Sequence, residues 1–436
     1  MKPKRSRTNQ DYTIQLRIAI ARFLPAKGLA LSGARWCPRM LVINIVLMVF
    51  SSCPSLEQRF AEARFSLVNM YPSRLRPGKT YAGFIRMLLR HSAALLSLVT
   101  DCLRKHVERT AGSHWKVGGR LAFGVDGTKI DSKRTSANEQ MLKIGGKNKS
   151  GPQQLLVVLM HVGTGLIWSF KRACATASER GLLLDQLELL PQACLLLADA
   201  GFTGYDLISR ILAGKRDLLL RAGANVTLLT DLLAESGCKV RFKEGLVYLW
   251  PCRWQNQEPL ILRQIVLVDG RNRRMCLLTN LSEQELTMQE ACELYEKRWG
   301  VELLYRGLKQ TLGRRKMHSS SPEHAQVELD WTISGYWMLG LMLWENRCQD
   351  VPVTSGMAFA VKLVRRCMAG RGDGRGTWSC SWSKLRVDES RRQSSKKARA
   401  WPHKKKDRPC GVPKLRMATA AEVQQAKTVM MKKQAA

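Results

Sequence analysis

The chain has 436 residues, and a hydrophobic content of 45% supplies the cores of two or three domains, which excludes a wholly disordered protein. It carries 71 Lys and Arg against 35 Asp and Glu, which is a formal charge of +36. Such a charge points to a polyanionic partner, because Lys and Arg release counterions when they neutralise phosphates. We expect nucleic acid first and an anionic membrane surface second.

The cysteines and the apolar runs indicate the compartment. The thirteen cysteines include no Cys-x-x-Cys pair, so neither a disulfide framework nor a zinc module is indicated. The longest uncharged apolar run near the N-terminus, Met40 to Phe50, is well short of the roughly 20 residues that span a membrane. It predicts a buried helix instead. We expect a soluble cytoplasmic protein with no membrane partner.

Residues 1–115 are basic and have a helical pattern. Between Gly83 and His106, apolar residues recur at spacings of four and seven, beginning at Phe84 and Leu88 and ending at Leu103. The pattern predicts a helical N-terminal region, and its basicity predicts that this region binds DNA.

Residues 116–217 change to strand patterns. Leu121 to Ile130 is an apolar run broken by Asp126-Gly127, and Gln154 to Phe170 contains two more apolar runs, so three strands in antiparallel succession are predicted. A helix is expected from Ser178 to Pro191. A short apolar strand, Cys194 to Ala198, then ends at Asp199. We predict the first part of an α/β catalytic core.

The remaining chain divides into three predicted regions. Residues 218–281 show several short strand patterns and few helix signals, which indicates a β-rich insertion. Residues 282–350 return to helices: a capping box at Thr287 begins a long helix to Leu312, and a buried helix covers Trp331 to Trp344. Residues 351–436 form a basic helix and tail, predicted to be partly disordered.

Three acids stand out by their positions. Asp126 lies within the first predicted strand, Asp199 ends a buried strand, and Glu302 lies on the long helix. A carboxylate in such a place needs compensation for lost hydration, which a divalent metal provides. Two strand carboxylates and one from a helix would form a hard oxygen site suited to Mg²⁺ or Mn²⁺.

The long helix carries further polar residues on one side. At 100° per residue from Tyr295, Arg298 falls at roughly 300°, Glu302 at roughly 340° and Lys309 at roughly 320°. An apolar stripe that includes Leu304 and Leu308 lies beside this arc. A carboxylate flanked by cations can bind a metal while the cations bind phosphates.

Each of these residues also has a simpler interpretation. Asp126-Gly127 is a common hairpin turn, and Asp131 is a rival metal ligand. A strand that ends in an Asp, as at Asp199, is frequent in α/β folds. An Arg, Glu, Lys series on a helix is usually a solvated face. Only the combination and the order of the residues favour a catalytic site.

The motifs resemble the DDE transposases of the insertion sequence four family. Tyr295-x2-Arg298-x3-Glu302-x6-Lys309 is similar to the Tyr, Arg, Glu, Lys signature of that family. Leu197 to Phe202 looks like its second motif and Val125 to Thr128 like its first. With softer matches at Pro77 to Phe84 and in the C-terminal tail, the resemblance covers about residues 70 to 425.

The resemblance implies an RNase H-like mixed sheet flanked by helices, with Asp126, Asp199 and Glu302 around two Mg²⁺ or Mn²⁺ ions. It implies metal-dependent cleavage and strand transfer at the terminal inverted repeats of the protein's own element, followed by insertion into target DNA. Arg298 and Lys309 would bind phosphates near the cut, and Tyr295 would position the terminal backbone. A homodimer on double-stranded DNA in the bacterial nucleoid is implied as well.

Two points remain open from the sequence. Some relatives hold a flipped base on a Trp of the insertion, and Trp250 and Trp254 are candidates here, although ordinary packing in a strand pair is the favoured interpretation. An RNase H-like nuclease without strand transfer and an inactive DNA-binding relic of a transposon are the alternative functions.

Overall fold

The computed structural model describes residues 7–25, 36–70, 76–145, 151–233, 244–268, 274–346, 353, 356–369 and 411–434. The chain forms two compact units. The first unit comprises Met1–Trp115, Gly127–Ala177 and Gly300–Ser390, and the second comprises Lys116–Asp126, Ser178–Trp299 and Arg391–Ala436. Residues 1–115 therefore share a unit with later segments, whereas the sequence predicted them as a region of their own.

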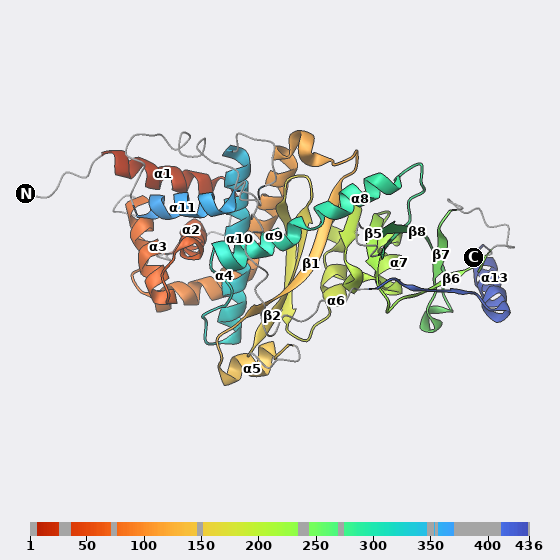
Figure 1. Cartoon of the computed structure of the whole chain (residues 1–436). Coiled ribbons are helices and arrows are strands. Elements are labelled where there is room, and N and C mark those ends of the chain that lie inside the picture. The colour runs from red at the N-terminus through yellow and green to blue at the C-terminus, as the bar shows by residue number, and fades with distance from the viewer. Residues whose placement is uncertain are drawn as a thin grey trace, which may run out of the picture. The chain divides into compact units, whose positions relative to one another are not determined.

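Helices dominate the first unit (Figure 1). They are α1 (Arg7–Ala21), α2 (Pro38–Phe50), α3 (Leu56–Met70), α4 (Tyr81–Thr110), α5 (Ser136–Leu142), α9 (Gly300–Arg306), α10 (Pro322–Asn346) and α11 (Met357–Met368). The unit also holds the antiparallel pair β2 (Gln153–His161) and β3 (Leu166–Cys174). The strands predicted across Gln154 to Phe170 are thus confirmed as a hairpin.

The core of the first unit is built on α10, which packs against α2 and α4. The predicted buried helix is confirmed and is longer than expected, because the pattern that begins at Pro322 is amphipathic before it becomes wholly apolar. The side chains of α2 from Met40 to Phe50 are all buried, as predicted. The Arg314 guanidinium donates hydrogen bonds to the carbonyls of Val49 (2.6 Å) and Ser51 (2.7 Å), at the end of α2. This cation satisfies carbonyls that a helix end leaves without partners.

Helix α4 buries the predicted stripe of Phe84, Leu88 and Leu103 along one face. By length and composition, α4 is the one described helix that meets the criteria for a membrane span, a test that core helices of folded domains also meet. Its contact with α10 lies within the unit.

A large mixed sheet dominates the second unit (Figure 1). The strands are β1 (Ala122–Asp131), β4 (Leu195–Ala198), β5 (Asp217–Ala222), β6 (Thr227–Thr230), β7 (Leu246–Leu249), β8 (Leu260–Val268), β9 (Arg274–Thr279) and β10 (Lys414–Met417). Their order in the sheet is β10-β6-β7-β8-β9-β5-β4-β1. Strand β1 crosses the boundary of the units after Asp126. The helices are α6 (Glu179–Leu184), α7 (Tyr205–Ala213), α8 (Met288–Lys297) and α13 (Ala420–Gln434).

The sheet is parallel from β1 through β4 to β5 and antiparallel from β5 through β9, β8 and β7 to β6. The strand at β5 was predicted as part of the insertion, but it pairs directly with β4. Helix α7, which the sequence analysis missed, connects these two parallel strands, as a crossover requires. Within the predicted β-rich insertion, the short strand pattern of Lys239 to Phe242 and the turn pattern of Asp269-Gly270 lie outside the described residues.

The predicted strand with Asp126 in its middle is confirmed as β1, which runs through Asp126-Gly127 without the alternative hairpin turn. Two local predictions are wrong. The helix predicted from Ser178 to Pro191 is the short α6 followed by a 3-10 turn at Leu187–Leu189. The long helix from Thr287 to Leu312 is divided into α8, α9 and a π-helical segment, Gly307–Thr311.

Candidate active site

The register of β1 and β4 determines where the two aspartates lie. These parallel strands pair Ala122 with Leu195 and Gly124 with Leu197. Continued by two residues, the same register sets Asp126 beside Asp199. Asp126, within β1, and Asp199, directly after β4, therefore lie next to each other on neighbouring parallel strands about 4.8 Å apart. Both residues are half-buried.

The backbone after β4 holds the Asp199 carboxylate in place. Its Oδ1 accepts a hydrogen bond from the Gly201 amide at 2.8 Å and caps the 3-10 turn Ala200–Phe202. Arg180 donates from Nε to the Gly201 carbonyl at 2.9 Å. A Cβ at Gly201 would lie 3.0 Å from that Oδ1, so this glycine suits the close approach of the carboxylate.

Helix α8 brings Tyr295 and Arg298 into the second unit. The predicted capping box is confirmed: the Thr287 side chain and the Glu290 side chain each bond the other residue's backbone amide. At the other end of the helix, Tyr295 is 7% exposed and Arg298 is 8% exposed. The Arg298 guanidinium lies 5.4 Å from the centre of the Tyr295 ring. Both residues are buried, whereas a solvated helix face was the simpler alternative.

Burial and three charged residues determine the direction in which the pKa of the Tyr295 hydroxyl is shifted. Burial raises the pKa of the Tyr295 hydroxyl, Arg298 and Arg221 oppose that rise, and the Asp199 carboxylate adds to it. Two cations and one catalytic candidate acid therefore lie close enough to act on the same hydroxyl.

Arg221 is the residue that sequence reasoning missed. It lies on β5, next to β4 in the sheet, and its buried Nε has no hydrogen-bond partner among the described residues. A buried donor of this kind is costly unless it meets an acceptor. A phosphate oxygen would satisfy it. The signal in the sequence was the single cation in the apolar strand Leu218 to Ala222.

Glu302 and Lys309 belong to the first unit. Glu302 lies in the first turn of α9 and is half-buried. Lys309 lies in the π-helical segment, and its Nζ donates to the Thr128 hydroxyl at 2.6 Å. Thr128 follows Asp126 by two residues on β1, so these two side chains point to the same face of the strand.

The four signature residues do not share one continuous helix. Tyr295 lies in the last turn of α8, Arg298 and Trp299 form a turn, and Glu302 lies in the first turn of α9, which belongs to the other unit. The 60° arc predicted at 100° per residue is therefore wrong as geometry. The π-helical segment carrying Lys309 changes the phase again, because its hydrogen bonds reach five residues instead of four.

Neither unit alone brings together three candidate metal ligands among the residues that the structure describes. Among the described residues, no three His, Cys, Asp or Glu side chains come together as candidate ligands. The second unit supplies the Asp126 and Asp199 pair, whose oxygens suit a hard cation, and the first unit supplies Glu302. Asp131, the rival ligand, is exposed and accepts a hydrogen bond from Gln153 Nε2 at 2.8 Å.

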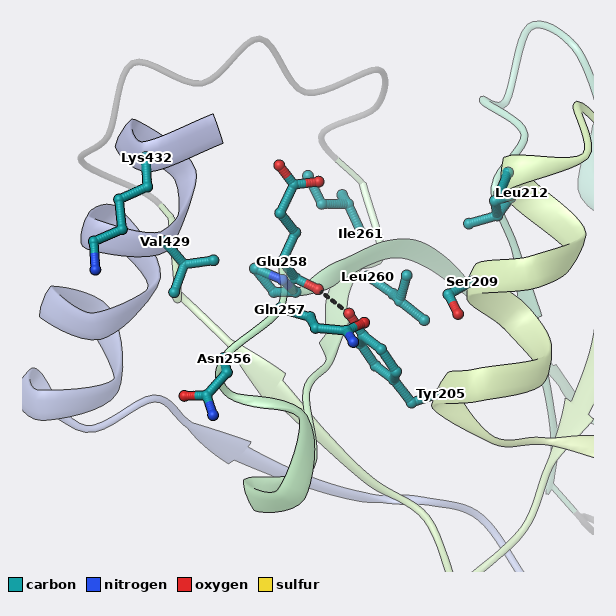
Figure 2. A pocket seen from close by; sticks show the side chains of 12 residues that line it. Tyr205, Ser209, Leu212, Asn256, Gln257, Glu258, Leu260, Ile261, Val429 and Lys432 are labelled. Atoms are coloured by element: carbon teal, nitrogen blue, oxygen red, sulfur yellow. Dashed lines mark hydrogen bonds between the residues drawn. The ribbon is translucent and has the colours of Figure 1, made fainter. Parts of the chain in front are cut away.

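A cavity of about 970 Å³ lies elsewhere in the second unit, among α7, the segment before β8, and α13 (Figure 2). The Tyr205 hydroxyl donates to the Glu258 carbonyl there at 2.5 Å. The Tyr205 ring is stacked on Trp254 with centroids 5.0 Å apart, and Trp250 is 3% exposed. Both tryptophans thus pack within the protein, which agrees with the packing interpretation.

Comparison with known proteins identifies the family. Residues 118–338, just over half of the chain, match the family described as Transposase DDE domain, and the chain belongs to that family. No curated protein matches the chain. Among solved structures, the piggyBac transposase in the cryo-EM structure of its synaptic complex with hairpin DNA matches at 11% identity. That match covers 85% of this chain and 75% of the other, with a TM-score of 0.39. At this low similarity the family match alone carries the assignment.

Proposed function

We propose that this DDE transposase cuts DNA at the ends of its own insertion sequence and joins the freed ends to a target, as members of the insertion sequence four family do. The observation that carries the proposal is the register of β1 and β4, which sets Asp126 beside Asp199 where β4 ends. Two neighbouring carboxylates repel each other when both are ionised, and a bound cation removes that cost.

In this proposal, Asp126, Asp199 and Glu302 bind divalent Mg²⁺ or Mn²⁺ in an RNase H-like fold, as two ions. Divalent cations supply acidity to a bound water and neutralise charge on the leaving oxygen of a phosphodiester. The family match supports the carboxylates, because it spans all three of them.

The cations near the aspartates bind the DNA backbone in this proposal. Arg298 and Arg221 are held beside Asp199 and Tyr295, so their charge faces the edge where a phosphate would be cut. Lys309, which donates to Thr128, would bind a second phosphate. Tyr295 lies under the Arg298 guanidinium and fixes its direction. Preorganised cations of this kind stabilise developing negative charge without moving.

The partners follow from the reaction and from charge. Double-stranded DNA fits the formal charge of +36, and a protein that joins two ends of one element acts as a homodimer on that DNA. We place the reaction in the cytoplasm.

The experiment is end cleavage in vitro. Purified protein is mixed with a labelled duplex that carries the terminal inverted repeat of the element, in Mg²⁺ or Mn²⁺, with and without unlabelled target DNA. We expect cutting at the element boundary and labelled joined products. Glu302→Gln should lower the rate at least about a thousandfold, since a lost ligand removes the site. Glu296→Gln, an exposed residue of α8, is the matched control and should cut normally.

Each result decides between the functions. Cutting without joined products would favour an RNase H-like nuclease without strand transfer. Binding of the duplex without cutting in either metal would overturn the catalytic assignment in favour of a DNA-binding relic. Equal rates for Glu302→Gln and Glu296→Gln would remove Glu302 from the site.

A further inference from the structure

A second group of basic side chains surrounds a cavity in the first unit. The cavity has a volume of about 680 Å³ and lies at the start of α10. Lys133, Lys316, His318 and His324 line it, together with serine hydroxyls and the single acid Glu57. None of these residues belongs to the signature that marks the transposase site.

The loop that carries most of these groups is held rigidly. The Glu328 carboxylate accepts hydrogen bonds from the His318 and Ser319 amides, each at 2.9 Å, and from the Ser319 hydroxyl at 2.7 Å. The Met317 amide donates to the Asp131 carbonyl at 2.7 Å. The loop is therefore attached both to α10 and to the end of β1, and its basic side chains are preorganised.

The opposite wall is fixed to the same loop. Lys133 donates from Nζ to the Ser320 hydroxyl at 2.9 Å, and the Thr135 hydroxyl donates to the Ser320 carbonyl at 2.8 Å. Lys133 is exposed, so its ammonium keeps further donors for a ligand. Lys133 and Lys316 thus face one cavity from two chain segments.

The electrostatic field in the cavity is positive. The pKa of His318 is lowered by burial first, and then by Arg59, Arg314, Lys316 and Lys133. The Glu328 carboxylate already accepts three hydrogen bonds from the loop and pairs with Arg59 at 3.7 Å. Two lysines, Lys133 and Lys316, line the cavity with only one acid, Glu57. This excess of positive charge favours an anionic ligand.

We infer that this cavity binds a phosphate of the DNA backbone through Lys133, Lys316 and the hydroxyl of Ser320. The inference rests on the DNA binding in the proposed function and adds a contact outside the catalytic residues. Its position supports this: Lys133 follows the strand that carries Asp126, and Lys316 follows the segment that carries Lys309. Both walls therefore continue chain segments that bear catalytic candidates.

The test measures DNA binding by fluorescence anisotropy over a series of salt concentrations. The wild type is compared with the double variant Lys133→Gln, Lys316→Gln and with the control Lys171→Gln, an exposed lysine of β3 in the same unit. We expect the double variant to reduce the slope of log Kd against log salt by about 1 to 2, and to weaken binding about tenfold. Lys171→Gln should leave both unchanged. Lys133→Arg with Lys316→Arg should retain the wild-type slope, and thermal melting confirms that each variant folds.

A second arm identifies the source of the phosphate. Histidine-labelled protein is titrated with inorganic phosphate and then with the duplex, and the NMR signals of His318 and His324 are followed. Shifts with both ligands support a site for the DNA backbone. Shifts with inorganic phosphate alone, with an unchanged salt slope in the double variant, would overturn the inference in favour of a small-anion site. If the wild type binds no DNA, the proposed function itself fails, which this arm separates from failure of the cavity.

Discussion

The two strand-borne aspartates and the helix-borne Glu302 and Lys309 are placed by different physical means. Asp126 and Asp199 are fixed by the hydrogen-bonded register of β1 and β4, where each residue can face only one of two sides. Glu302 and Lys309 depend on where a helix starts and on how many residues make each turn. An error of one residue in the helix start rotates every later side chain by about 100°. The positions of site residues on strands can therefore be predicted more reliably than the positions of site residues on helices.

Gly307 shows how the phase is set on the helical side. A Cβ at this residue would lie 2.1 Å from the Tyr336 hydroxyl of α10, which no side chain tolerates. The π-helical segment begins at this glycine and contains Lys309. Close packing against Tyr336 and the wide π turn thus occur together, and Lys309 reaches Thr128 from that turn.

The largest expected effect tests the sheet side of the comparison. Arg221→Gln should lower the rate of DNA cleavage about a hundredfold, because it removes a preorganised cation beside Asp199. Single-turnover cleavage of the labelled duplex measures this rate. Folding should be retained, since the Arg221 Nε bonds no described residue.

The matched control is Arg210→Gln, an exposed arginine of α7 in the same unit. Like Arg221→Gln, this substitution removes one positive charge from the protein, but at a residue outside the candidate site. If both variants slow cleavage equally, the effect comes from total charge, and Arg221 has no place in the site.

A smaller effect tests the helical side. Gly307→Ala should destabilise the protein by about 1 to 3 kcal/mol, because overpacking against Tyr336 forces the segment to shift. Urea unfolding measures the loss. Tyr336→Phe removes the hydroxyl that the new methyl would meet, so combining the two substitutions should recover part of it.

Gly181→Ala is the control, since a Cβ in that helix would meet nothing closer than 3.7 Å. We expect it to be neutral or slightly stabilising, as alanine favours a helix over glycine by up to about 1 kcal/mol. Equal destabilisation at Gly181 and Gly307 would show that the contact with Tyr336 is unimportant.

Much of the fold and the strand acids were predictable from local patterns. The apolar runs around Asp126 and before Asp199 gave β1 and β4, and the capping box at Thr287 gave the start of α8. These features depend on a few adjacent residues, so the sequence alone is sufficient. The hairpin interpretation of Asp126-Gly127 failed because the run of buried residues Ala122 to Val125 continues as one strand.

The missed features depend on distant parts of the chain. The helix is interrupted after Lys297, next to the point between Trp299 and Gly300 where the chain passes from one unit to the other. No local sequence pattern marks this boundary. The π-helical segment begins at Gly307, which packs closely against Tyr336 of another helix. Arg221 joined the site only because β5 pairs with β4, whereas its strand was predicted as part of an insertion.

The smallest expected effect concerns the C-terminal segment, which was predicted to be a partly disordered tail. Here an ion pair holds the chain in position, whereas sheet register and helix phase place the residues discussed above. In the described part of that segment, β10 pairs with β6 and α13 follows. Glu422 accepts hydrogen bonds from Arg416 at 2.7 and 2.8 Å and from the Thr419 amide at 2.9 Å. These bonds, with Arg416 first, lower the pKa of Glu422 to about 2. Because the folded pKa lies below the ordinary value, the stabilisation is present above about pH 4.5 and is lost as the pH falls toward 2.

We therefore expect Glu422→Gln to weaken hydrogen-exchange protection of the α13 amides by about 1 kcal/mol at pH 7, where the wild-type carboxylate is charged. The effect is modest because the Arg416 side chain is 45% exposed and its charge is screened. At pH 3 the two proteins should differ less, because the Glu422 carboxylate takes up a proton when α13 opens but stays ionised in the folded state, so the proton favours opening of the wild type. Comparing the two proteins at each pH cancels the other acids of the chain, so only Glu422 contributes to the change. A difference that is equal at pH 7 and pH 3 would mean that the Glu422 carboxylate keeps its ordinary pKa, and that β10 and α13 are held by packing alone.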